Sequence, residues 1–305
     1  MATTKIPKTI KVDSYFASRM SVSPDGRSAL ISGELGAMFL LDFSSWKASP
    51  WTRLSSAPNA IQHSPDGAKV ALSFASESSA HERVEVRDAN DGSLLASFDA
   101  RDPTQASAVI ETLSWSPNGA RIVGVSSSAV DKDSPHLAVF DLAHSSVKHL
   151  RVCSHYQLAA GFLDDRTVLA LTSRKLQPGD GPDTDLLVLD LETGAIERKG
   201  DGAMDVVKSV ERLADGKMFA TASYDAARVI DRDANVLWTA GKGGLAFSDG
   251  SQILTMDGRK NLERTTPDGV TTPIGKAAKA SFAMFVVAGH LLLLQERQVQ
   301  VLPLQ

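Results

Sequence analysis

The sequence has a single cysteine, few aromatic residues and no long apolar run. Cys153 alone cannot form an intramolecular disulfide or supply a cysteine-based metal site. The longest apolar run, at 285–294, is interrupted by Gly289 and His290 and is too short to cross a bilayer. The first residues lack the apolar stretch of a signal peptide. These absences exclude a disulfide scaffold and predict a soluble, cytoplasmic protein with no membrane partner.

Positive and negative residues are nearly equal in number, which argues against a nucleic-acid ligand. Lys and Arg number 32 against 36 Asp and Glu, giving a net charge of −4. A chain of this charge without a basic run has no general attraction for a nucleic-acid backbone. We therefore expect no nucleic-acid partner. Because 43% of the residues are hydrophobic and 22% are charged, the composition is that of a globular protein.

Turns of one kind recur along the chain between apolar segments. Pro presets the second turn position, Asp or Asn tolerates the third and Gly accepts a positive φ, so each copy predicts a β-hairpin. Three copies are nearly identical: Val22-Ser-Pro-Asp-Gly26, His63-Ser-Pro-Asp-Gly67 and Trp115-Ser-Pro-Asn-Gly119. Weaker copies follow at 163–166, 213–216, 247–250 and 287–289. The turns lie roughly 34–52 residues apart, which predicts seven repeats.

Each repeat has the strands expected of a propeller blade. A second strand follows the turn, and a third, often ending in Asp, comes next, as at 137–141 and 186–190. A polar turn such as Asp91-Gly92 then leads to an outer strand such as 93–98. Four strands in roughly 40–50 residues are typical of one blade. The sequence therefore predicts an all-β fold, a seven-bladed β-propeller of four-stranded antiparallel blades.

The two ends of the chain predict how the ring closes. The seventh repeat stops after its third strand, at 299–302, and Thr9-Ile-Lys-Val12 can supply the missing outer strand. No break in composition marks a second domain, so we expect a single propeller domain over residues 1–305 and a monomer. The expected blades are at about 15–54, 55–100, 101–152, 153–200, 201–241, 242–275, and 276–305 together with 8–13.

The chain resembles the WD-repeat and TolB-like β-propeller superfamily over essentially its whole length. The resemblance rests on the Ser-Pro-Asp-Gly turns and on strands that end in Asp, as in Val139-Phe-Asp-Leu142 and Glu85-Val-Arg-Asp88. No Trp-Asp dipeptide ends a third strand, so the TolB-like side is the more similar. The resemblance implies the fold and says little of function, because propellers serve as scaffolds, receptors and some enzymes.

Four residues are candidates at the expected channel mouth. His63 and Trp115 precede Ser-Pro at the end of an inner strand, where packing near the channel is favoured over catalysis. His155 and Tyr156 open the first strand of blade 4, and a general-base role there lacks a partner carboxylate. None of the seven His residues has the spacing of a His-Glu-x-x-His site.

Three further features have simpler structural interpretations. Cys153 has no evident His partner to activate it as a nucleophile. The segment 88–92 resembles a calcium loop, but its Gly falls one position early and the required Glu is missing. The segment 241–244 lacks the spacing and the Ser or Thr of a phosphate-binding loop. We expect no cofactor, no metal and no catalytic residue.

The loops that join second to third strands differ in length, and the long ones are consecutive. Those near 75–82, 127–136 and 173–185 belong to the adjacent blades 2–4, where they should form one raised wall with the connection 99–108. The charged wall residues are Glu77, Glu82, Arg83, Asp131, Lys132, Asp133, Arg174, Lys175, Asp180, Asp183 and Asp185. This acid-leaning rim favours a basic protein partner, and solvated loops that bind nothing are the alternative.

These features together favour a non-catalytic protein-binding propeller, such as an adaptor, an assembly factor or a protein that neutralises its partner. The alternative is an enzyme or small-molecule binder that uses the channel mouth, as propeller lyases and lactonases do with clustered His, Glu and metal. The few visible candidates leave too few ligands for a metal site of that kind.

Overall fold

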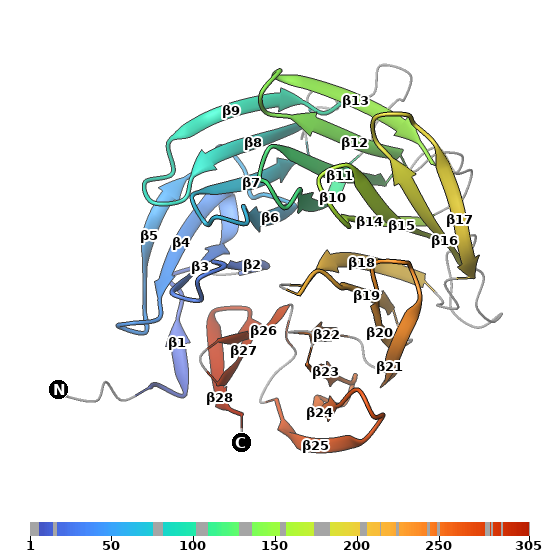
Figure 1. The fold of residues 1–305 in the computed structure, drawn as a ribbon. Coiled ribbons are helices and arrows are strands. Elements are labelled where there is room, and N and C mark those ends of the chain that lie inside the picture. Colours follow the sequence, from blue (N-terminus) through green and yellow to red (C-terminus); the bar gives the residue numbers. More distant parts are fainter. Residues whose placement is uncertain are drawn as a thin grey trace.

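A computed structural model describes residues 6–14, 17–75, 82–101, 109–127, 136–152, 157–173, 184–201, 206–213, 215–223, 226–242, 245–248, 251–277, 281, 283–287 and 289–304. In these residues, 28 β-strands form seven four-stranded antiparallel sheets. The sheets stand around a central channel as the blades of a propeller (Figure 1). The predicted all-β, seven-bladed propeller is confirmed.

Each of blades 1–4 has its strands in sequence order from the channel outward. Blade 1 contains β2 (Arg19–Val22), β3 (Ser28–Ser32), β4 (Ala37–Asp42) and β5 (Lys47–Arg53), with the short helix η1 (Glu34–Gly36) before β4. Blade 2 contains β6 (Ala60–His63), β7 (Lys69–Phe74), β8 (Arg83–Asp88) and β9 (Leu94–Asp99). Blade 3 contains β10 (Val109–Trp115), β11 (Arg121–Ser127), β12 (His136–Asp141) and β13 (Ser146–Arg151). Blade 4 contains β14 (Gln157–Phe162), β15 (Thr167–Ser173), β16 (Thr184–Asp190) and β17 (Ile196–Asp201).

Blades 5 and 6 repeat this order, and blade 7 borrows its outer strand from the beginning of the chain. Blade 5 contains β18 (Val206–Arg212), β19 (Met218–Ser223), β20 (Ala226–Ile230) and β21 (Val236–Lys242). Blade 6 contains β22 (Leu245–Ser248), β23 (Ile253–Met256), β24 (Asn261–Thr265) and β25 (Thr271–Lys276). Blade 7 contains β26 (Ala283–Val287), β27 (His290–Gln295), β28 (Gln298–Pro303) and β1 (Thr9–Lys11).

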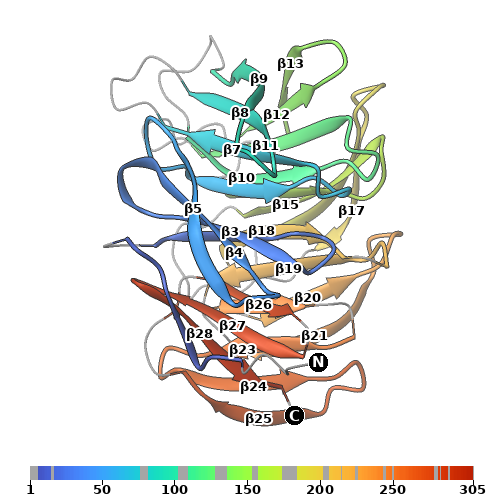
Figure 2. The same ribbon diagram turned by 90° about the vertical axis from the view of Figure 1, so that its left-hand side faces the viewer.

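Pairing of β1 with β28 closes the ring, as the sequence predicts. The two strands are antiparallel, with Ile10 opposite Val299. Both views show β1 alongside β28 (Figures 1 and 2). The first and last strands of the chain therefore share one sheet, which gives β28 a hydrogen-bonded neighbour in place of an open edge.

The turns between first and second strands have the geometry that their sequence dictates. In the turn after β2, the Gly26 N–H donates to the Ser23 carbonyl at 2.9 Å, and Gly26 has a φ of 66°. The Ser23 hydroxyl donates to Asp25 Oδ1 at 2.7 Å, and that oxygen also accepts the Arg27 N–H at 3.0 Å. Positive φ is cheap for Gly, which is why it recurs at this position.

The hydrophobic core consists of clusters that lie between neighbouring blades. One cluster joins Leu30 and Met38 of blade 1 to Leu72 and Phe74 of blade 2. Another joins blade 7 to blade 1 and includes Ile10 of the closing strand β1. Corresponding clusters fill the other five boundaries. Because each blade buries its faces against its neighbours, the stability of the ring depends on closure.

The two faces of the ring have different connections. One, here called the turn face, carries the turns between first and second strands and between third and fourth strands. The other, here called the loop face, carries the loops between second and third strands and the connections between blades. Among the described residues, no helix has the length and apolar character needed to cross a membrane.

Candidate functional site

The structure describes only part of the predicted wall. Glu82, Arg83 and Asp185 lie at or next to the beginning of third strands, on the loop face of blades 2 and 4. The other wall residues lie outside the described residues: Glu77, Asp131, Lys132, Asp133, Arg174, Lys175, Asp180 and Asp183. The channel-mouth candidates His155 and Tyr156, together with Cys153, also lie outside them.

Arg83 is held by three contacts within the protein. Its Nε donates to Glu85 Oε1 at 2.7 Å, and its Nη2 donates to Ser55 Oγ at 2.6 Å. The guanidinium lies over the Phe74 ring, 4.5 Å from the ring centroid. Glu82, the preceding residue, is only 8% exposed, so its side chain does not project from the rim. This pair forms the base of the predicted wall.

Asp185 also has a partner within its own blade. Arg198 on β17 donates from Nε to Asp185 Oδ1 at 2.7 Å. The ion pair joins the third and fourth strands of blade 4. Asp185 and Arg83 therefore mark the loop face in blades 2 and 4 with charges that are already paired.

His63 and Trp115 link neighbouring blades. His63 Nδ1 and Ser21 Oγ are 2.9 Å apart across blades 1 and 2, and burial lowers the pKa of His63 to about 4. Trp115 Nε1 donates to the Gln62 carbonyl at 3.0 Å across blades 2 and 3. Each is 5% exposed. A neutral, buried imidazole and a buried indole at equivalent positions hold the inner strands together near the channel.

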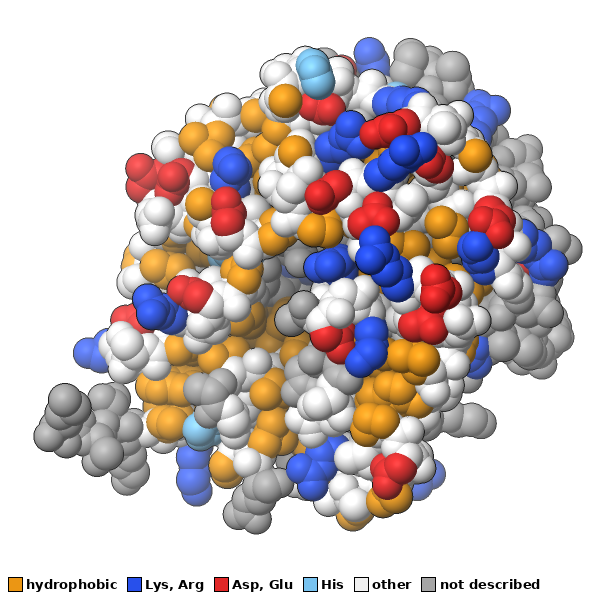
Figure 3. Space-filling model, in the orientation of Figure 1, with side chains coloured by type: hydrophobic (Ala, Val, Ile, Leu, Met, Phe, Trp, Pro, Cys, Tyr) orange, Lys and Arg blue, Asp and Glu red, His pale blue; other side chains and the backbone are white. Residues whose placement is uncertain are grey.

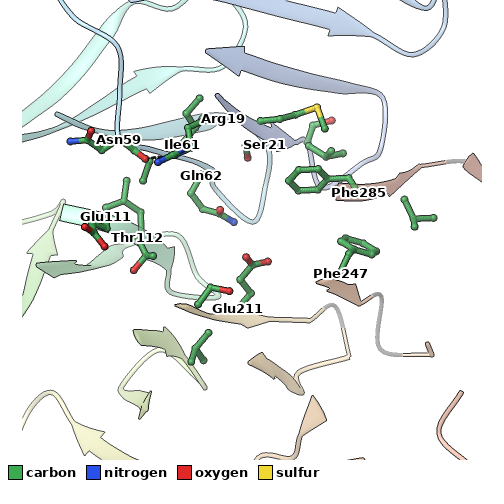
Figure 4. Close-up of a pocket in the computed structure, with 18 residues that line it drawn as sticks. Arg19, Ser21, Asn59, Ile61, Gln62, Glu111, Thr112, Glu211, Phe247 and Phe285 are labelled. Atoms are coloured by element: carbon green, nitrogen blue, oxygen red, sulfur yellow. Dashed lines mark hydrogen bonds between the residues drawn. The ribbon is translucent and has the colours of Figure 1, made fainter. Parts of the chain in front are cut away.

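The channel contains a pocket of about 350 Å³ (Figure 4). Residues of the inner strands of six blades, all but blade 4, line it, and they provide both polar and apolar side chains. The face of the ring seen in Figure 3 is hollowed near its centre. Pockets of this size and mixed character are typical of small-molecule and side-chain binding sites.

Glu211 on β18 points into this pocket, toward the side chain of Gln62 (Figure 4). Its carboxylate has no hydrogen bond or ion pair with any other described residue. The side chain is exposed to the water in the channel, and the protein atoms of the channel wall around the carboxylate raise its pKa by displacing part of its hydration. In the part of the chain that the structure describes, the charged form of this acid therefore has no partner.

Two phenylalanine rings line the same pocket as Glu211. Phe247 on β22 and Phe285 on β26 have ring centroids 6.0 Å apart and are inclined by 57°. Both line the pocket, on the same side of it (Figure 4). On the other side lies Thr112, whose buried hydroxyl oxygen has no hydrogen-bond partner among the described residues.

Bulges interrupt two of the inner strands that line the pocket. In β10 the pairing with β11 shifts between Ile110 and Thr112, and in β18 the pairing with β19 shifts between Val207 and Ser209. A bulge bends its strand and re-aims the neighbouring side chains, and bulges are common next to binding sites. Glu111 lies at the first of these bulges and lines the pocket.

A second pocket, of about 300 Å³, lies on the turn face between blades 4 and 5. Its charged groups already have contacts within the protein. Lys217 Nζ lies 2.7 Å from Asp215, and Arg232 Nη2 lies 3.5 Å from Asp164. Arg212 Nε donates to the Leu163 carbonyl at 3.2 Å. Because these charges are engaged, this pocket offers a ligand less than the channel does.

No group of three or more His, Cys, Asp and Glu residues that could hold a metal ion occurs in the part of the chain that the structure describes. None of Glu211, Glu111, Phe247 and Phe285 is among the site residues expected from the sequence. A charged residue within the innermost strand of a predicted blade is the signal that points to Glu211, because inner strands surround the channel.

Comparisons with known proteins agree with the architecture. No family model and no curated protein matches the sequence. Among solved structures, the chain is similar to the Cps50 (Swd1) beta-propeller domain of Myceliophteria thermophila, with a TM-score of 0.72 and 13% identity. The similarity covers 97% of this chain and 99% of that one. At this identity the likeness shows the fold alone.

Proposed function

We propose that this protein is a non-catalytic protein-binding propeller that receives its partner on the loop face of blades 2–4. The observation that carries the proposal is the unequal length of the loops between second and third strands. These loops span 75–82, 128–135 and 174–183 in blades 2–4, but only 224–225 in blade 5 and 296–297 in blade 7. Long loops on a rigid scaffold are frequent binding elements.

The three blades with long loops are neighbours in the ring. Core clusters join blade 2 to blade 3 and blade 3 to blade 4. The loops therefore arise from adjacent positions on one face. Their acidic residues would attract a basic protein surface and speed its association. An adaptor, an assembly factor and a partner-neutralising protein would each use such a surface.

Fewer residues now support the alternative, an enzyme or small-molecule binder that uses the channel mouth. His63 and Trp115 are occupied in contacts between blades, so neither is free to act on a substrate. We therefore favour binding over catalysis for the channel pocket, because catalysis there would have to proceed without His63 and Trp115.

A charge-matched pull-down tests the proposal. One variant replaces Glu77, Asp131, Asp133, Asp180 and Asp183 with Ala. The control variant replaces five exposed acids outside these loops: Glu192, Glu197, Asp233, Glu263 and Glu296. Both variants change the net charge equally, so they separate a local surface from general electrostatics. We expect the wild type and the control variant to retain similar amounts of a partner protein. The wall variant should retain at least about tenfold less of it.

Equal retention by the wall variant and the wild type would contradict the proposal, as would equal loss from both variants. Thermal unfolding of all three proteins should give the same midpoint within a few degrees, because exposed charges contribute little to stability.

A further inference from the structure

Equivalent positions on the inner strands form a layer around the channel near the turn face. Every inner strand runs from the loop face to the turn face, so their next-to-last residues lie at similar depth. This turn-side layer consists of Ser21, Gln62, Ser114, Gly161, Glu211, Phe247 and Val286. Glu211 is the one charged residue among these seven. The layer therefore places a single negative charge among neutral groups.

The other charged groups of the pocket lie closer to the loop face. Arg19 is the first residue of β2, and Glu111 is the third residue of the longer strand β10. Arg19 Nε donates to the Asn59 carbonyl at 2.7 Å, and its Nη1 donates to the Ser18 carbonyl at 3.0 Å. Arg19 thus has backbone partners of its own and forms no ion pair with Glu211.

Three other residues that line the pocket suit a positively charged group. The faces of Phe247 and Phe285 carry negative charge density that attracts cations. With their centroids 6.0 Å apart, the rings leave no room for a cation between them, so a ligand would lie against them from the channel. The Gln62 side chain, which Glu211 faces, offers an amide oxygen that can accept an N–H.

From this arrangement we propose that the turn-side layer of the channel binds an organic cation with N–H donors, an alkylguanidinium or alkylammonium group. Glu211 accepts the N–H groups and neutralises the charge. Phe247 and Phe285 contact the cation and its alkyl chain, and Gln62 accepts a further hydrogen bond. The group can belong to a free amine or to a side chain of another protein. This site stands apart from the loop-face surface, and neither requires the other.

Calorimetric titration of the full chain tests the site with butylguanidinium and butylammonium as probes and with neutral butyramide as their control. We expect both cations to bind and butyramide to bind at least about tenfold more weakly, the difference that a charge-assisted hydrogen bond provides. Equal binding of butyramide and the cations, or no binding of either cation, overturns the proposal.

Two substitutions place the site. Glu211→Gln keeps the side-chain shape and should weaken cation binding at least about tenfold, whereas Phe247→Leu should weaken it about threefold or more. Glu263→Gln is the matched control, since Glu263 is exposed on β24 outside the channel, and it should bind like the wild type. Unchanged binding by Glu211→Gln, or equal weakening by Glu263→Gln, overturns the proposal.

A capped Ala-Arg-Ala peptide distinguishes the two sources of the cation. Binding at least as tight as that of butylguanidinium supports a side chain of another protein as the ligand. Binding of butylguanidinium without binding of the peptide supports a free small cation. Thermal unfolding of Glu211→Gln confirms that the variant is folded, so a loss of binding reports on the carboxylate.

Discussion

Carboxylates on the turn face and the carboxylate in the channel have opposite surroundings. Asp190 accepts the N–H groups of Glu192 and Thr193 at 3.0 and 2.9 Å and lies 2.7 Å from Arg166. These contacts, above all the Thr193 N–H, lower the pKa of Asp190 to about 2. The channel wall displaces water from Glu211, which has no partner among the described residues, and this raises the pKa of its carboxyl group.

The difference separates two uses of an acidic side chain. A carboxylate that accepts backbone N–H groups stabilises the turn that contains it, and the charged form is the favoured one. Asp42, Asp141, Asp231 and Asp257 are hydrogen-bonded in the same way, and each has a lowered pKa. A carboxylate that lacks such donors contributes nothing comparable to folding, which is why Glu211 points to a ligand.

Breaking a turn should give the largest effect. Ser64 is fully buried, and its hydroxyl accepts the Lys69 N–H at 2.9 Å and donates to Asp66 Oδ1 at 2.5 Å. Ser64→Ala leaves these groups without their partner, so we expect it to lower the free energy of unfolding by about 1–3 kcal/mol. Urea denaturation measures this change.

The control for this substitution lies in an exposed turn. Ser44 donates from its hydroxyl to Asp42 Oδ2 at 2.9 Å. Ser44→Ala should change the free energy of unfolding by no more than about 0.5 kcal/mol. Comparable effects of the two substitutions would show that burial does not determine the strength of these turns.

Removing the channel charge should act in the opposite direction. Because the folded-state pKa of Glu211 is raised above its ordinary value of 4.5, charging it destabilises the fold as the pH rises through that raised pKa. Glu211→Gln should therefore increase stability at neutral pH, and its stability should converge with that of the wild type as the pH falls below about 4.5, where Glu211 becomes protonated in both states. Denaturant titrations from pH 4 to 8 measure the difference. Lower stability of Glu211→Gln at pH 7 would reveal a partner for the carboxylate.

The smallest effect is expected at Asp190, because its contacts are exposed to solvent and screened. Its lowered pKa means that the charged form stabilises the fold above the unfolded-state value near 3.8, and that this contribution disappears as the pH falls toward 2. Asp190→Asn should thus be less stable than the wild type at pH 6, with the two proteins converging near pH 2. A difference that persists at pH 2 would assign the effect to shape rather than charge.

Local sequence patterns were sufficient for the blades. The Ser-Pro-Asp-Gly turns depend on the φ preferences of Pro and Gly and on short side chains that bind their own backbone, and all of these act within six residues. Gly67 and Gly119 have the expected positive φ, at 72° and 68°. The closing strand was predictable as well, because the last repeat lacks an outer strand and the first residues alternate polar with apolar.

The candidate site was less accessible to sequence reasoning. The wall residues were chosen by loop length and charge, yet Glu82 is buried and Arg83 is bound to Glu85 and Ser55. Ser55 is 28 residues before Arg83 in the sequence, so no local pattern encodes the contact between them. The channel residues were missed because a single Glu in a strand has no motif.

The sequence by itself determined the number of blades, the order of strands within each blade and the strand that closes the ring, because turn chemistry and strand alternation are short-range properties. Only the tertiary structure decided which side chains share the channel. Glu211, Phe247 and Gln62 come from blades 5, 6 and 2, and they approach one another because ring closure places the ends of the inner strands around one axis.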